Sequence, residues 1–241
     1  MAHPSWNALE VEAENAKSLD ELFQLWKEAH KAEENYEVTT LREEGIPQDS
    51  FIADGYISQE NYAGVLFILK EANILKDEVP AGSEPFYRPQ ADWYRPERRD
   101  NSPKQKEKMG RMASYIRYHH IQNFQIALQQ SAFLNLNKRG GGNHTHKKKL
   151  TAYTHRYAPF IQREIALLQP KQIICLGHPT DALVDKCHLN FIDEKRIFTV
   201  NMWHPAYRMK GIPRYPVSDM DQNVDAYMKE FIKRYNKINK C

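Results

Sequence analysis

The chain of 241 residues is poor in cysteine and has no long apolar run. Its three cysteines are Cys175, within an apolar stretch, Cys187, after a helical pattern, and Cys241, at the last position. No two of them have the spacing of metal ligands, and three free thiols fit a reducing compartment. No apolar run approaches the length of a membrane span, and no signal-peptide pattern opens the chain. We therefore expect a cytoplasmic protein without a membrane partner.

Two further signatures are missing, those of a phosphate-binding loop and of a metal site. The glycine run at residues 140–142 lacks the Gly-Lys pair that a phosphate loop needs at a fixed spacing. The histidine pairs at residues 119–120 and 144–146 have no carboxylate or cysteine spaced to complete a metal site, and cationic residues lie near them. The sequence therefore predicts no metal and no cofactor.

Charge is unevenly distributed along the chain, although the formal net charge is only +3. Residues 1–50 hold 12 acidic and 4 basic side chains, whereas residues 86–149 hold 14 basic and 4 acidic ones. A concentrated positive segment is the electrostatic pattern of a protein that binds a phosphate backbone. We therefore expect DNA as a partner. The alternative is a solvated basic segment that binds nothing.

The hydrophobic pattern predicts an α/β protein preceded by an acidic helical segment. Ser18 and Glu21 have the spacing of a capping box, and a helical apolar pattern follows, so residues 1–50 are expected to form a helical N-terminal addition. The expected strands are residues 64–69, 131–137, 172–176 and 197–202. Because helical patterns alternate with these strands, residues 51–241 are predicted to form a three-layer α/β/α sandwich with a mainly parallel central sheet of about four strands.

The segments between these strands differ in character. A proline-rich insertion at about residues 75–110 is longer than ordinary connections, and loops of this length are usually functional or disordered. One helix is expected over about residues 106–130, and a mobile basic loop over residues 139–149. The last helix carries an apolar stripe of Val224, Met228, Phe231 and Tyr235.

Polar side chains stand at or near the ends of several expected strands. Lys70, Glu71 and Asn73 follow the first strand, Asn135 lies in the second, and His204 follows the last. Ligands of open α/β sheets bind beyond the carboxyl ends of the strands. A histidine there can hydrogen-bond an oxygen that gains negative charge, a carboxylate can orient or deprotonate water, and an asparagine can read an amide-like edge.

The order of these pieces resembles the uracil-DNA glycosylase superfamily over roughly residues 60–235. The matching pieces are Glu71-Ala72-Asn73, Asn135, a helix near residues 157–168, the strand that ends in Leu176-Gly177, and His204-Pro205. The resemblance implies that Glu71 or Asn73 positions the attacking water. It also implies that Asn135 reads the base and that His204 stabilises the departing base. Some members of that superfamily hold an iron–sulfur cluster on four cysteines, which three scattered cysteines cannot supply.

A glycosylase would also contact the flipped base and the duplex, and the resemblance implies the position of the residues that fill the gap left by that base. Phe86 or Trp93 would stack on the extruded base. The residues that would fill the gap left in the duplex are Tyr207, Arg208 and Met209. The residues that would contact phosphates are Lys138, Arg139, Lys147, Lys148 and Lys149.

Each of these roles has a structural alternative. Glu71 would instead form a surface ion pair, and Asn135 would bond a strand end. Phe86 and Trp93 would form a small core within the insertion, and His204 would cap its strand.

The first motif of this chain departs from the usual pattern of the superfamily, in which glycine and proline make a tight turn. Lys70 and Ile74 stand where such residues are expected, so the turn is not expected to hold a small pyrimidine closely. We therefore expect a larger or modified base rather than plain uracil as the substrate, with Lys70 bonding its added polar groups. A deaminated purine fits this expectation, as does a modified pyrimidine of phage DNA if the source is bacterial.

The sequence thus predicts a monofunctional DNA glycosylase that flips a damaged or modified base and hydrolyses its N-glycosidic bond. Its roles would be base excision repair or defence against phage DNA. One alternative is a DNA-binding protein on a glycosylase-like fold that has no catalytic activity, because a fold does not determine a function. Another is a nucleoside or nucleotide hydrolase, which would need no basic DNA-binding segment.

Overall fold

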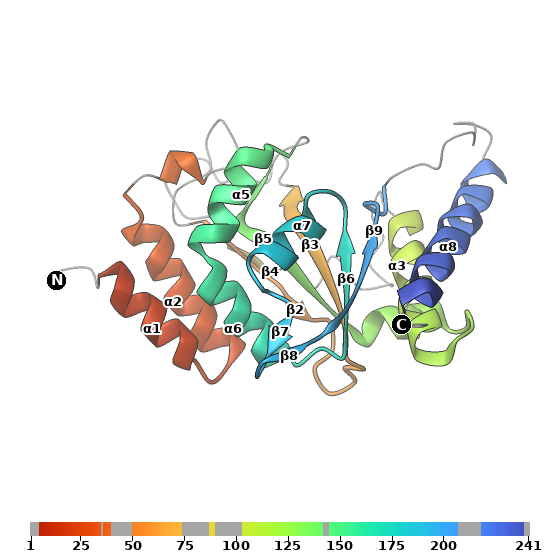
Figure 1. Ribbon diagram of the computed structural model, residues 1–241, viewed down its shortest axis with the longest axis horizontal. Helices are drawn as coiled ribbons and strands as arrows, with labels where there is room; N and C mark the ends of the chain where they lie inside the picture. The colour runs from red at the N-terminus through yellow and green to blue at the C-terminus, as the bar shows by residue number, and fades with distance from the viewer. Residues whose placement is uncertain are drawn as a thin grey trace.

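A mostly parallel sheet forms the centre of the protein (Figure 1). The computed structural model describes residues 5–34, 36–39, 50–73, 87–89, 103–141, 145–206 and 218–238. The strand order is β2-β5-β3-β6-β9, and all neighbours are parallel except β2, which runs antiparallel to β5. The strands are β2 (Gly55–Tyr56), β3 (Val65–Asn73), β5 (Ser131–Gly141), β6 (Gln172–Leu176) and β9 (Phe198–Met202). The expected α/β class with a mainly parallel central sheet is confirmed, and the short β2 adds a fifth strand.

Helices cover both faces of the sheet. Successive side chains of a strand point to opposite faces, and here both sets are apolar and buried. On β3, Leu66 and Ile68 belong to one buried cluster, whereas Val65, Phe67 and Leu69 belong to another. The first cluster includes residues of α1 (Trp6–Asn15), α2 (Leu19–Ala32), α5 (Lys147–Arg156), α6 (Ala158–Leu168) and α7 (Thr180–Lys186). The second includes residues of α3 (Pro103–Tyr118), α4 (Phe124–Gln129) and α8 (Ser218–Ile238). Figure 1 shows α1, α2 and α6 on one side of the sheet and α3 and α8 on the other.

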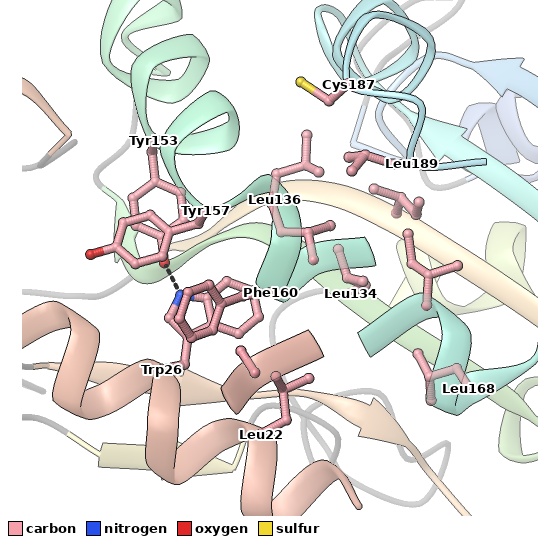
Figure 2. Packing of buried hydrophobic residues seen from close by; sticks show 14 of the residues in the cluster. Leu22, Trp26, Leu134, Leu136, Tyr153, Tyr157, Phe160, Leu168, Cys187 and Leu189 are labelled. Atoms are coloured by element: carbon pink, nitrogen blue, oxygen red, sulfur yellow. Dashed lines mark hydrogen bonds between the residues drawn. The ribbon is translucent and has the colours of Figure 1, made fainter. Parts of the chain in front are cut away.

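Helix α2 begins where its sequence pattern predicts. The Ser18 side chain accepts a hydrogen bond from the Glu21 N–H (3.2 Å), and Glu21 Oε2 accepts one from the Lys17 N–H (2.7 Å). Trp26 is fully buried, and its indole N–H donates to the Tyr153 hydroxyl on α5 (3.1 Å; Figure 2). Helix α2 therefore packs into the same hydrophobic cluster as residues of the sheet.

The expectation of one helix over residues 106–130 is wrong. The segment forms two helices, α3 and α4, and the turn between them places His119 and Asn123 at positive φ (57° and 42°). A Cβ atom on Gly110 would lie 2.4 Å from the Phe124 carbonyl oxygen, so α4 begins in direct contact with the backbone of α3. Glycine at this position allows α4 to pack closely on α3, and no proline in the turn marks the break.

The expectation of a mobile loop over residues 139–149 is also wrong for the part of that segment that the structure describes. Strand β5 continues to Gly141, and α5 begins at Lys147. Smaller elements that the sequence pattern did not predict are the parallel pair β1 (Phe51–Ala53) and β4 (Tyr87–Pro89), the hairpin β7 (Phe191–Ile192) and β8 (Lys195–Arg196), and the 3-10 helix η1 (Tyr36–Val38). Most of the insertion expected at residues 75–110 lies outside the described residues.

A hydrogen-bond network around Tyr153 surrounds a buried histidine. His30 Nδ1 lies 3.0 Å from the Ser50 carbonyl oxygen, and its Nε2 lies 2.8 Å from the Tyr153 hydroxyl. Since that hydroxyl accepts a hydrogen bond from Trp26, its own proton is available to Nε2, and Nδ1 then carries the ring hydrogen. Burial, and then the charge of Arg139, hold the pKa of His30 well below 6.5.

We predict that this neutral imidazole makes stability depend on pH. Below about pH 6.5, His30 is protonated in the unfolded chain but stays neutral in the folded protein. The free energy of unfolding should therefore fall by up to about 1.4 kcal/mol per pH unit as the pH decreases. His30→Asn should be less stable than wild type at about pH 8 but should lose stability less steeply between about pH 7 and 5. Urea unfolding at a series of pH values measures this slope.

Trp26→Phe is the matched control for this experiment. It removes the indole hydrogen bond to Tyr153 from the same buried cluster but removes no titrating group. It should therefore lower stability and keep the wild-type slope. Equal slopes in wild type and His30→Asn would contradict the prediction.

Candidate functional site

The carboxyl ends of β3, β6 and β9 meet at one edge of the sheet. Gly177, directly after β6, donates its N–H to the Met202 carbonyl oxygen at the end of β9 (2.8 Å). Gly177 has a φ of +86°, and a Cβ atom there would lie 3.2 Å from the Cβ atom of His204. A side chain would thus be strained by the backbone and crowded by the imidazole. Glycine at this position lets His204 pack against the end of β6.

His204 is held as a neutral imidazole at this edge. Its Nδ1 accepts a hydrogen bond from the Ala206 N–H (3.2 Å), within the turn that Pro205 begins. Burial lowers the pKa of His204 to about 4, with help from the positive charges of Lys70 on β3 and Lys108 on α3. At neutral pH the ring hydrogen is therefore on Nε2, which can donate a hydrogen bond to a ligand.

Glu71 lies at the same edge and is held at one of its two oxygens. The Thr145 hydroxyl donates to Glu71 Oε1 (2.6 Å), whereas Oε2 is buried without a hydrogen-bond partner among the described residues. Burial raises the pKa of Glu71, and the Thr145 hydrogen bond and the charge of Lys70 oppose that rise. The surface ion pair considered for Glu71 does not describe this buried carboxylate. A carboxylate with one free oxygen and a raised pKa is suited to accept a proton from water.

Lys70 connects these two groups electrostatically. Its charge lowers the pKa of His204 and also opposes the rise in the pKa of Glu71. The Asn73 backbone continues β3 beyond an irregularity in its register with β5, but the Asn73 side chain lies outside what the structure describes. Lys70, Glu71 and His204, three of the residues predicted for catalysis and substrate binding, are thus brought to one edge.

Thr145 and Lys108 were not predicted as site residues. Thr145 lies 74 residues after Glu71 and two residues before α5 begins. Lys108 donates from Nζ to the Pro205 carbonyl oxygen (2.9 Å), although the two residues are 97 positions apart. No spacing in the sequence signals either contact, because both depend on how the helices pack against the sheet.

Asn135 is bound to a neighbouring carboxylate instead of facing an open site. It is 1% exposed, and its Nδ2 donates to Asp54 Oδ2 (3.0 Å). Its backbone N–H donates to the same oxygen, just beyond the point where β2 stops pairing with β5. The donor half of the predicted base-reading amide is therefore occupied by Asp54. The alternative of an asparagine at a strand end describes these contacts better.

The prediction that Lys138 and Arg139 contact phosphate is wrong, because both side chains are buried. Lys138 Nζ binds Asp54 and lies 2.7 and 2.9 Å from the carboxylate oxygens of Glu164. Arg139 pairs with Glu33 (2.5 Å) and also donates to Thr39 and Tyr157 (2.8 and 3.2 Å). Both residues lie in β5, although Arg139 was expected in the loop, and buried acids supply their counter-charges.

Lys147, Lys148 and Lys149 form the first turn of α5, next to the candidate site. Lys147 and Lys148 are exposed, and Lys149 is half-buried. The first turn has no acidic residue, and the side chain of His146 makes no capping hydrogen bond. Because Thr145 is bonded to Glu71, this positive turn is adjacent to the end of β3. A helix N-terminus and three lysines together favour a negatively charged ligand.

The other residues expected to contact a base or duplex lie outside the described part of the chain. They are Phe86, Trp93, Tyr207, Arg208 and Met209. Among the described residues, no group of three or more His, Cys, Asp and Glu side chains is arranged to hold a metal ion. Within the same residues, no helix has the length and apolar character needed to cross a membrane.

No protein-family model matches the chain, and no curated protein matches it either. The chemistry at the strand ends therefore has to be inferred from the side chains that meet there. Those side chains are a neutral imidazole, a half-satisfied carboxylate, and two lysines that act on the imidazole.

We predict that Lys138 contributes to folding and not to nucleic-acid binding. Lys138→Met would leave Asp54 and Glu164 buried without their cation, so stability should fall by about 3–5 kcal/mol in urea unfolding. Lys148→Met, the control at an exposed lysine, should change stability by less than about 0.5 kcal/mol. A Lys138→Met protein as stable as wild type would show that the buried cluster does not need its charge.

Proposed function

We propose that this protein is a monofunctional DNA glycosylase, which flips a base out of the duplex and hydrolyses its N-glycosidic bond. The observation that carries the proposal is a neutral His204 whose Nε2–H has no recorded partner among the described residues, at the same strand ends as the half-satisfied carboxylate of Glu71. Breaking a glycosidic bond to a base places negative charge on the departing base and positive charge on the sugar. The two groups match those two charges.

His204 would act on the departing base. Its Nε2–H would donate a hydrogen bond to a base oxygen as negative charge develops there, while the imidazole itself stays neutral. Lys70 and Lys108 add positive charge around the same ring. In a partly buried site, such preorganised donors and charges stabilise a transition state more than they would in water.

Glu71 would act on water and on the sugar. Because Thr145 holds Oε1, the free Oε2 is the atom to orient or deprotonate a water molecule that attacks C1′. The carboxylate charge would also stabilise the oxocarbenium character of the sugar. Asn73 remains the alternative for orienting water, since an amide can orient a water molecule but cannot take its proton.

A modified or enlarged base is the proposed substrate, with plain uracil a poorer one. Lys70 occupies a position where the superfamily that the sequence resembles has a small or rigid residue. Its charge acts directly on His204, so a long cationic side chain takes part at the strand end. Such a side chain suits a base that carries additional hydrogen-bond acceptors, among them the modified pyrimidines of phage DNA.

The first test is cleavage of duplexes that each hold one candidate base. Single-turnover reactions with uracil, hypoxanthine or glycosylated hydroxymethylcytosine, followed by alkali, convert each abasic site into a strand break. We expect cleavage of at least one of the two larger bases, and a loss of about 10²–10³-fold in His204→Ala with DNA binding retained. Glu71→Gln should also slow cleavage and change its pH dependence.

His188→Ala is the control, because His188 is exposed and lies after α7, outside the site. Its cleavage rate should equal that of wild type. Fast cleavage of uracil alone would contradict the proposed base class. Duplex binding without cleavage of any base would favour the rival, a DNA-binding protein without catalytic activity.

A second prediction concerns the positive first turn of α5. Replacing Lys147, Lys148 and Lys149 by Gln should weaken binding to all duplexes about equally, because phosphate contacts carry no sequence information. The slope of log K against log salt should fall by up to about 0.9 for each phosphate that the variant no longer neutralises. The matched control replaces three exposed lysines of α8, Lys229, Lys233 and Lys237, and should leave the slope unchanged. Equal slopes for the two triple variants would exclude α5 from the interface.

A further inference from the structure

The outer edge of β9 is bonded by side chains in place of another strand. Strand β9 is the last strand of the sheet, so carbonyl groups on its outer side have no strand partner. The Asn201 carbonyl oxygen accepts from Arg234 Nη1 (2.8 Å), and the Trp203 carbonyl oxygen accepts from the Tyr227 hydroxyl. Both donors come from α8. Two alternate carbonyls at the end of this edge, those of Asn201 and Trp203, are therefore bonded by helix side chains.

Lys108 extends this row past the end of the strand. Its Nζ donates to the Pro205 carbonyl oxygen (2.9 Å), which is the next carbonyl in the alternation 201, 203, 205. Lys108 comes from α3, is 2% exposed, and lies 4.6 Å from the centre of the Tyr227 ring. The row thus fixes the backbone on both sides of His204, through Tyr227 before it and Lys108 after it.

The charged and titrating groups around His204 come from several elements. Lys70 reaches it from β3 and Lys108 from α3, and both charges act on the imidazole. From α8, Tyr227 bonds the preceding carbonyl, and the Arg234 guanidinium lies 4.4 Å from the Trp203 ring centre. From β6, the backbone of Gly177 lies against the His204 side chain. Lys108 is the member of the carbonyl row whose charge also acts on the ring.

We propose that Lys108 is a positioning residue for His204, which fixes the turn through the Pro205 carbonyl and whose ammonium charge keeps the imidazole neutral, with Nδ1 accepting from Ala206 and the hydrogen on Nε2. The catalytic part of this role rests on the proposed glycosylase function. The electrostatic part is independent of that function, because it concerns the pKa of His204 in the protein without DNA. Anchoring and charge are separable, since Tyr227 anchors the same turn without a charge and Lys70 supplies charge without a bond to the turn that the structure records.

The first experiment titrates His204 by NMR in the free protein, and its signal is assigned from its absence in His204→Gln. In the wild-type protein, His204 should titrate with a pKa of about 4. Lys108→Gln, whose amide can still donate to Pro205, should raise the pKa of His204 by roughly one unit, because a nearby positive charge is removed. Lys70→Met should raise it as well. Tyr227→Phe should leave it unchanged, and Lys108→Arg should restore the wild-type value.

Two results would overturn the proposal. One is a folded Lys108→Gln protein in which the pKa of His204 is the same as in wild type. The other is an equal rise in the pKa of His204 in Tyr227→Phe. Such a rise would mean that any loosening of the turn hydrates the imidazole and removes the effect of its burial. If Lys108→Gln does not fold, the pKa of His204 in Lys108→Arg still tests the electrostatic role. The guanidinium keeps the charge with a different shape, so an altered pKa of His204 in that variant would contradict the electrostatic role.

The second experiment uses single-turnover base release as a function of pH. In the Glu71→Gln background, where that carboxylate no longer titrates, Lys108→Gln should move the acid limb of the profile to higher pH in parallel with the NMR value, whereas Tyr227→Phe should lower the rate without moving the limb. If no base is released by wild type, the glycosylase proposal fails while the NMR result stands. If bases are released and the limb does not move, Lys108 has no role in positioning the catalytic imidazole.

Discussion

The parallel register of β3, β6 and β9 is the constraint on which the candidate site depends. Phe67, Ile174 and Val200 lie side by side in the three strands and are buried. Three residues further along the chain from these stand Lys70, near the end of β3, and Gly177 and Trp203, just after β6 and β9 end. His204 follows Trp203, two residues after the end of β9. A row of apolar side chains that packs in the core thus fixes which polar groups meet at the edge, and a shift by one residue would separate them.

The residues at the strand ends could be predicted from the sequence because their positions follow from the apolar runs. Glu71 and His204 stand directly after such runs, and both lie at the common edge. Thr145 and Lys108 could not be predicted in the same way. Each contacts the site from a segment 74 or 97 residues away, at a position that only helix packing determines. The break between α3 and α4 has no local signal either, because the turn forms at non-glycine residues with positive φ, His119 and Asn123, and carries no proline.

The positive charges of the basic segment lie in two different environments. The basic segment contains buried cations in β5 and exposed lysines in α5, and the sequence presents them as one run. The partners of Lys138 and Arg139 lie 84, 26 and 106 residues away, at Asp54, Glu164 and Glu33. A local charge count cannot detect partners at such separations. Among the described residues, the exposed positive surface is therefore smaller than the net charge of the segment suggests.

The ion pair between Glu33 and Arg139 makes the folding of the central sheet depend on the N-terminal helices. Glu33 directly follows α2, and His30 on that helix binds the carbonyl of Ser50. A shortened protein that began at residue 51 would keep all five strands of the central sheet and all the residues proposed for catalysis. It would also bury an arginine without its acid and expose one side of the core. The smallest unit able to fold is therefore larger than the smallest unit that contains the chemistry, and the acidic N-terminal helices belong to it.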